Sequence, residues 1–136
     1  MFNSIDKVER PSLLPALTLA IIGDTVYDLY FKNRLITQKA MLCGKIHTEA
    51  VRFVKASAQA EAIKEIEPSL TEEEDAIYKR GRNAKSQSVP RHADLGDYHM
   101  ATGFETLIGY LYLSERYERI DELLNTTFNI LDKEQE

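Results

Sequence analysis

Apolar residues recur every three to four positions along most of this chain, which is the spacing of amphipathic helices. Near the start, Leu17, Ile21, Tyr27 and Phe31 follow this spacing, so we expect a first helix from Pro15 to about Leu35. No stretch alternates apolar and polar residues for long enough to indicate a strand. The pattern therefore predicts an all-α fold.

Caps and prolines set the limits of the other expected helices. A second helix is expected over 47–66, where Pro68 stops it, and a third from Thr71 to about residue 81. Thr71 opens the segment "TEEE", which has the spacing of a capping box. Asp97 is the expected cap of the next helix, and Ser114 the expected start of the last one. With five or six helices, no repeat and no linker, residues 1–136 are expected to form one domain.

Composition narrows the class of protein. The chain has 136 residues, of which 43% are hydrophobic and 29% charged, as in an ordinary globular domain. We find no signal peptide and no apolar run long enough to span a bilayer, so no membrane partner is expected. The single cysteine, Cys43, fits a reducing compartment, and a cytoplasmic location is expected.

The charges are unevenly distributed. The net charge is −5, and residues 115–136 account for −4 of it with seven acids and three bases. By contrast, residues 76–93 contain no acid and several Lys and Arg residues. A local basic patch on an acidic protein can hold phosphates. The alternative is that these bases only complement a helix dipole and lie in solvent.

Two carboxylates stand on strongly apolar helices. Asp24 follows the apolar part of "AIIGDTVYDLY", and Glu105 lies within "ATGFETLIGYLYL"; we expect both to be buried. Two such acids on separate helices can share a divalent cation, because Mg²⁺ prefers oxygen ligands and keeps several waters. The alternative is that each acid pairs with a base or caps a helix. Gly23, Gly103 and Gly109 beside them favour close helix packing.

Three segments together resemble one known family. They are "IGDTVYDLY" at 22–30, "KRGRNAKS" at 79–86 and "YHMATGFETLIGYLYL" at 98–113. In order and distance they resemble the ribonuclease III catalytic domain, and most closely its short Mini-ribonuclease III branch, from about residue 17 to residue 124. The resemblance implies a homodimeric all-α endonuclease domain without the double-stranded-RNA-binding domain of the longer enzymes. Where the longer enzymes carry further acids, this chain has Ala20 and Thr102, so the implied metal site has fewer carboxylates.

The resemblance also implies an activity. It makes the chain a metal-dependent endoribonuclease that hydrolyses double-stranded RNA, with Asp24 and Glu105 as catalytic residues that bind Mg²⁺, for which Mn²⁺ can substitute. A water activated by the metal would attack the phosphorus. The Mini branch matures the ends of 23S rRNA precursor at a stem. A precursor rRNA stem is therefore the implied substrate, and a ribosomal protein or the pre-ribosome is a further candidate partner.

Without an appended domain, the catalytic domain itself has to hold the duplex through phosphates and 2′-hydroxyls. The candidates for this contact lie in "KRGRNAKS" and are Arg80, Arg82, Asn83, Lys85 and Ser86. Arg91 and His92 extend the patch. A second, weaker basic face is formed by Arg52 and Lys55, with Gln59 one turn further on.

Two other classes of protein stay open. A non-catalytic double-stranded-RNA-binding or ribosome-associated module of the same fold would keep the basic patch and lose a metal acid, whereas this chain has both acids. A helical adaptor would show no Mg²⁺-dependent cleavage of RNA. Asp28 is either an outer contact of the metal site or a solvated charge, and His47 either touches substrate or is structural.

Overall fold

The computed structural model of the protein describes residues 7–85, 89, 91 and 94–132. This part of the chain contains α-helices and two short 3-10 helices and no strand, which confirms the all-α prediction. In chain order they are η1 (Pro11–Leu13), α1 (Ala16–Lys39), α2 (Cys43–Val54), α3 (Ala56–Ile66), η2 (Glu67–Ser69), α4 (Glu72–Arg82), α5 (Leu95–Leu113) and α6 (Tyr117–Asp132). None of the helices described here has both the length and the apolar composition needed to cross a membrane.

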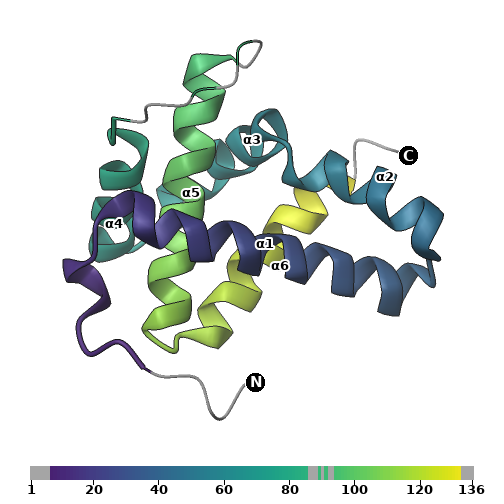
Figure 1. Ribbon diagram of the computed structural model, residues 1–136, viewed down its shortest axis with the longest axis horizontal. Helices are drawn as coiled ribbons and strands as arrows, with labels where there is room; N and C mark the ends of the chain where they lie inside the picture. Colours follow the sequence, from purple (N-terminus) through teal and green to yellow (C-terminus); the bar gives the residue numbers. More distant parts are fainter. Residues whose placement is uncertain (1–6, 86–88, 90, 92–93, 133–136) are drawn as a thin grey trace.

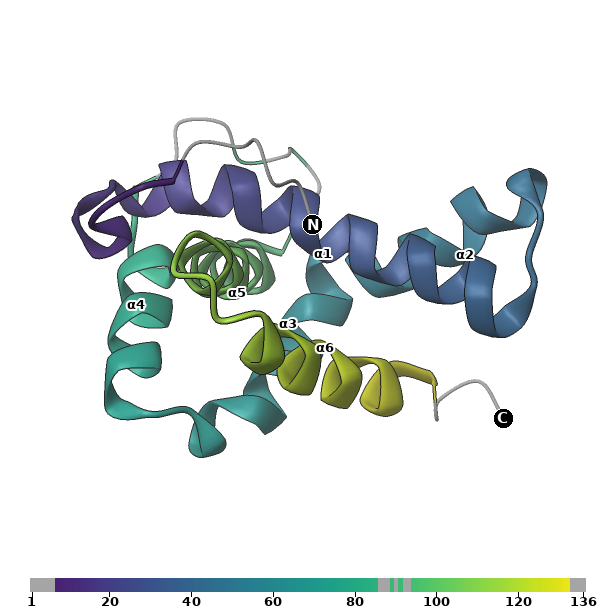
Figure 2. The ribbon, with the colours of Figure 1, turned by 90° about the horizontal axis from the view of Figure 1, so that it is seen from below.

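Helix α5 is the centre of the fold. Figure 1 shows α1 crossing it, and Figure 2, which looks nearly along α5, shows α1, α3, α4 and α6 arranged around it. From Ala101 to Leu111 every side chain of α5 is buried except that of Glu105. The almost continuous apolar sequence of this helix follows from that position, because a helix surrounded by others has no solvent-facing side.

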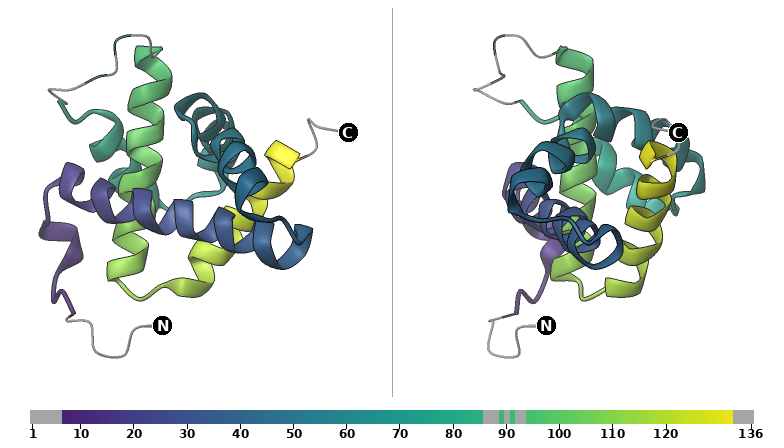
Figure 3. Two further views of the ribbon diagram at one scale, coloured as in Figure 1. Left: turned by 45° about the vertical axis from the view of Figure 1, so that its right-hand side comes forward. Right: turned by 90° about the vertical axis from the view of Figure 1, so that its right-hand side faces the viewer.

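A second part of the core lies where the C-terminal half of α1 meets α2 and α6, seen from two sides in Figure 3. The rings of Phe31, Phe53 and Phe128 stack there, with centroids 5.0 Å apart for Phe31–Phe53 and 5.3 Å for Phe53–Phe128. The Tyr27 hydroxyl donates to the Phe53 carbonyl at 2.6 Å. These contacts join one helix from each of three distant segments, and so fix the direction of α1.

The predicted helix over 47–66 is wrong, because the chain breaks there into α2 and α3. Lys55 lies between them with an extended backbone, φ −64° and ψ 152°. The break allows α2 to pack on α1 while α3 packs on α5. Neither Pro nor Gly stands near Lys55, so tertiary packing, which a local pattern does not contain, decides the break.

The predicted ends of the other helices were partly right. The capping box at Thr71 is confirmed: its hydroxyl accepts from the Glu74 N–H at 3.1 Å and its own N–H donates to Glu74 at 2.9 Å. The predicted cap of α5 is wrong, because Asp94 caps it and accepts from the Asp97 N–H at 2.9 Å. The first helix extends beyond Leu35, and the last begins at Tyr117 after a turn in which Glu115 has φ 59°.

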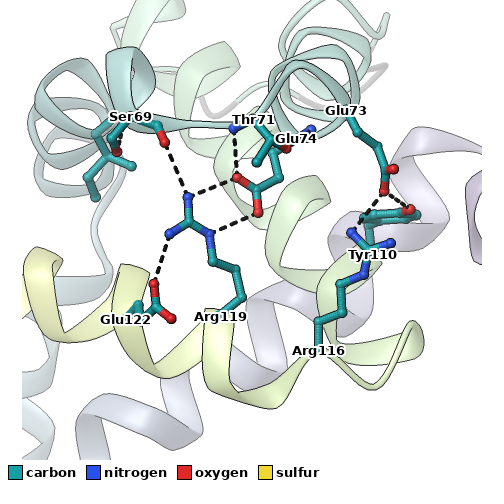
Figure 4. A network of polar contacts seen from close by, with 9 residues as sticks. Ser69, Thr71, Glu73, Glu74, Tyr110, Arg116, Arg119 and Glu122 are labelled. Atoms are coloured by element: carbon teal, nitrogen blue, oxygen red, sulfur yellow. Dashed lines mark hydrogen bonds and ion pairs between the residues drawn. The ribbon is translucent and has the colours of Figure 1, made fainter.

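A polar network fastens α4 to α6 (Figure 4). The buried Glu74 carboxylate accepts two hydrogen bonds of 2.9 Å from the Arg119 guanidinium, which also reaches Glu122 and the Ser69 carbonyl. Burial alone would raise the pKa of Glu74, but Arg119 and the Thr71 N–H outweigh burial and hold it below its usual value. Glu74 is therefore an ionised, fully paired carboxylate with a structural role.

Candidate metal centre and nucleic-acid interface

The backbones of α1 and α5 touch where they cross. A Cβ on Gly23 would lie 1.7 Å from the Glu105 carbonyl oxygen, and one on Gly109 would lie 1.9 Å from the Leu19 carbonyl oxygen. No other residue fits at either position without moving the helices. A Cβ on Gly103 would lie 2.7 Å from the Tyr78 ring, so the close packing expected from Gly23, Gly103 and Gly109 is present.

This crossing brings Asp24 and Glu105 together, close enough for a hydrogen bond between their carboxyl groups. Asp24 itself is exposed, so the prediction that it is buried is wrong, whereas Glu105 is mostly buried. Asp24 follows the glycine that faces α5 and therefore lies at the edge of the helix contact. The pair has one carboxylate inside the contact and one open to solvent.

Burial raises the pKa of Glu105 to about 8, with further contributions from the hydrogen bond and the negative charge of Asp24. The neighbouring Asp24 carboxyl group thus makes it harder for Glu105 to ionise. A divalent cation would remove this conflict, because its positive charge takes the place of the proton on Glu105.

Gln59 on α3 is the third polar side chain of this site, and the prediction that it lies on a basic face is wrong. Only 2% of it is exposed. Its amide nitrogen donates to the Val54 carbonyl at 2.8 Å and lies 3.4 Å from Glu105 Oε2. The available signal was its position among the residues that α3 buries, Ala58, Ala62 and Ile63, where a polar residue needs a partner.

The donor set fits a hard cation that keeps most of its water. Within the described residues no group of three or more His, Cys, Asp or Glu side chains is placed to hold a metal ion, so Asp24 and Glu105 are the acids available. Mg²⁺ is commonly bound by one or two carboxylates and several waters. Thr102, at the position of a missing acid, is buried and its hydroxyl donates to the Tyr98 carbonyl at 2.9 Å.

The sequence left the roles of two further residues, Asp28 and His47, undecided. Asp28 pairs with Lys32 one turn further along α1, at 2.8 Å, which favours the solvated-charge alternative. His47 is exposed on α2.

The candidate RNA-binding residues lie at the end of α4 and differ in their surroundings. Arg80 donates to the Ser12 carbonyl at 2.9 Å and to the Leu14 carbonyl at 2.8 Å, so its guanidinium fastens the N-terminal segment to α4. Arg82 is half-buried, with its guanidinium 5.7 Å from the Tyr78 ring centroid. Asn83 and Lys85 are exposed. Ser86 and His92 lie outside the described residues.

The second basic face borders a shallow groove of about 400 Å³ beside the start of α3. Lys55 is exposed there, whereas Arg52 is paired with Glu49. The groove is lined by Arg52, Lys55 and Lys64 but also by Glu61 and Asp97. The groove therefore has mixed charge. Gln59 is buried and does not line it.

Comparisons with known proteins agree with this geometry. Residues 17–116 match the model of the ribonuclease III domain. The Mini-ribonuclease 3 of Symbiobacterium thermophilum is 39% identical over 129 residues, 95% of this chain and 99% of that protein. That of Brevibacillus brevis is 44% identical over 124 residues, 91% of this chain and 92% of that protein. A crystal structure of a Fusobacterium nucleatum protein has a TM-score of 0.77 at 28% identity, covering 84% of this chain and 93% of that one.

An all-α domain whose two central helices cross at glycines and bring two carboxylates together is the architecture of a ribonuclease III domain. The chain belongs to the ribonuclease III family of endoribonucleases, and within it to the Mini-ribonuclease 3 branch. The resemblance carried by "IGDTVYDLY", "KRGRNAKS" and "YHMATGFETLIGYLYL" is confirmed.

Proposed function

We propose that this chain cleaves double-stranded RNA with a Mg²⁺ ion held by Asp24 and Glu105. The observation that carries the proposal is the contact of these two carboxyl groups at the α1–α5 crossing. The two residues are 81 positions apart in sequence. Mn²⁺ has the same preference for oxygen ligands and should replace Mg²⁺.

The two acids have different tasks. When bound, a divalent ion supplies an activated water and neutralises charge on the phosphate. Glu105 is held rigidly by the buried helix α5, so it fixes the position of the ion and has to give up its proton for binding. Asp24 faces solvent, so it holds the ion on the side from which a phosphate can approach.

The duplex has to lie against the same face, and we assign its phosphate contacts to the end of α4. Lys85 and Asn83 are exposed and can reach a backbone phosphate or 2′-hydroxyl, and Asn83 Oδ1 also accepts from Arg82 Nε at 3.2 Å. Ser86 belongs to the same segment. Arg80 contributes mainly by holding the N-terminal segment in place, because its guanidinium already binds two carbonyls.

A second copy of the chain fits an exposed aliphatic row. Leu13, Leu17 and Ile21 are 71%, 37% and 73% exposed on η1 and the outer side of α1. Apolar side chains grouped in this way mark interfaces more often than free surface. A homodimer also suits the substrate, because a two-fold axis can present one site to each of two antiparallel strands.

The biological setting that we propose comes from the resemblance to the Mini-ribonuclease III branch. We infer that the substrate is the stem joining the ends of 23S rRNA precursor, cleaved in the cytoplasm during ribosome biogenesis. A ribosomal protein or the pre-ribosome would then present the stem.

Incubation of the purified protein with a duplex RNA tests the proposal. We expect cleavage of the duplex with Mg²⁺ or Mn²⁺ and no cleavage with EDTA. The same RNA strand without its complement should not be cleaved. Tight duplex binding without cleavage in either metal would instead support the non-catalytic module of the same fold. The presence of both acids in contact favours the nuclease.

A further inference from the structure

We propose that Gln59 is a positioning residue, which holds the Glu105 carboxylate in the orientation that binds the cation. The inference rests on the proposed function, because it requires Glu105 to be a metal ligand. Gln59 is on α3, so it would make a third helix part of the metal centre.

Gln59 is an uncommon residue for its surroundings. It is 2% exposed, and its neighbours along the buried side of α3 are alanines and isoleucines. A buried amide without hydrogen-bond partners costs on the order of 1–3 kcal/mol. Of its polar atoms, Nε2 has two acceptors within reach, whereas Oε1 is buried without a hydrogen-bond partner. The side chain is therefore paired through its nitrogen alone.

The two acceptors determine how the amide is turned. Nε2 carries two hydrogens. It donates one to the Val54 carbonyl oxygen, with an N–O distance of 2.8 Å, and directs the other to Glu105 Oε2, with an N–O distance of 3.4 Å. Rotating the amide by half a turn would place its oxygen against the Val54 carbonyl oxygen, which repels it. The backbone at the end of α2 thus orients Gln59, and Gln59 in turn faces Glu105.

At 3.4 Å the contact is long, and it would shorten with an ionised Glu105 carboxylate. A carboxylate that holds a cation is ionised, and N–H groups bind ionised acceptors more strongly than neutral ones. With Glu105 pinned through one oxygen by Gln59, its other oxygen is left for the ion. Residues that orient metal ligands in this way typically contribute about 10- to 100-fold in metal affinity.

A metal titration without RNA tests the role directly. Mn²⁺ binding is measured by electron paramagnetic resonance of the free ion for the full chain and for Gln59→Met, which keeps the length and loses the donor. Ile63→Val is the matched control, since it alters a fully buried residue one turn along α3 that has no polar group. Thermal unfolding in EDTA measures what each change costs the fold.

We expect Gln59→Met to weaken Mn²⁺ binding about 10-fold or more, and Ile63→Val to leave it within about twofold. In the Glu105→Gln background, Gln59→Met should change the Mn²⁺ affinity by less than about twofold, because its effect passes through Glu105. Excess Mn²⁺ should restore the cleavage rate of Gln59→Met with an unchanged KM for duplex RNA. If Gln59→Met does not fold, Gln59→Asn, one methylene shorter, should show the same loss.

Mn²⁺ binding by Gln59→Met equal to wild type, while Glu105→Gln binds weakly, would overturn the positioning role alone. An equal loss from Gln59→Met in both backgrounds would also overturn it, because Gln59 would then act without Glu105. Equal binding by wild type and Glu105→Gln would overturn the proposed metal site and this inference with it.

Discussion

Glu105 concentrates the chemistry of the site in one side chain. It is the one residue from Ala101 to Leu111 that is only partly buried. Its carboxyl group lies beside the Asp24 carboxyl group and the Gln59 amide. The protein keeps an acid where an apolar residue would be more stable. Such a cost is expected at positions kept for function.

The raised pKa of Glu105 predicts how the metal-free protein responds to pH. Between the ordinary pKa of 4.5 and about 8, the folded state keeps a proton that the unfolded state has lost. Stability should therefore fall as pH rises through this window, by at most about 1.4 kcal/mol per pH unit, and level off above it. Denaturant unfolding in EDTA from pH 5 to 8.5 measures this slope. Glu105→Gln should flatten it, and the same slope in both proteins would contradict the assignment.

The bases at the end of α4 predict two separable effects. Lys85 is exposed, so Lys85→Ala should weaken duplex binding and reduce the slope of log affinity against log salt by about 1. Arg80 donates to two carbonyls, so Arg80→Ala should lower the stability of the fold by about 1 kcal/mol. RNA titrations at several KCl concentrations and thermal unfolding of both variants measure these effects. A wild-type salt slope for Lys85→Ala would mean that the duplex binds elsewhere, with the face around Lys55 next to be examined.

At the scale of the elements, the crossing of α1 and α5 determines the site. Gly23 and Gly109 let the two backbones touch, and the residue after Gly23 then lies beside Glu105. The position of the Asp24–Glu105 pair is thus a consequence of helix packing, with no loop involved. A site built on two packed helices is held more rigidly than one built on loops.

Gly23→Ala should disrupt both the fold and the site, because its Cβ would lie 1.7 Å from the Glu105 carbonyl oxygen. We expect a loss of about 1–3 kcal/mol, the usual cost of overpacking, together with a loss of Mn²⁺ binding. Gly44→Ala is the matched control, since nothing lies within 4 Å of a Cβ there and the residue is in α2. Thermal unfolding should show Gly44→Ala at least as stable as wild type. Equal stability of the two variants would contradict the close crossing.

Much of this arrangement could be predicted from local sequence. The "TEEE" capping box acts within a few residues, and glycines beside acids on apolar helices indicate close helix packing whatever the partner helix; both are confirmed. Three features could not be predicted from local sequence, because each depends on which helix packs against which. They are the break at Lys55, the exposure of Asp24 and the burial of Gln59. Half a turn of rotation of α3 about its own axis would exchange its exposed and buried faces.

At the scale of the whole molecule, the exposed aliphatic row on η1 and α1 predicts the state of assembly. Ile21→Lys places a charge on the most exposed residue of this row, so it should shift the protein from dimer to monomer. Analytical ultracentrifugation measures the shift. Leu42→Lys, at the N-cap of α2 and 82% exposed, is the control and should stay dimeric. A wild-type protein that sediments as a monomer would contradict the proposed dimer.

The central claim is that Asp24 and Glu105 serve one metal ion, and single-turnover cleavage of duplex RNA in Mg²⁺ tests it most directly. Asp24→Asn and Glu105→Gln should each lose more than the roughly 100-fold that loss of an outer contact costs. The double variant should be little worse than either, because residues that act as one unit lose activity non-additively. Circular dichroism should show all three folded. Near wild-type cleavage by either single variant, or two defects that multiply in the double variant, would contradict the account.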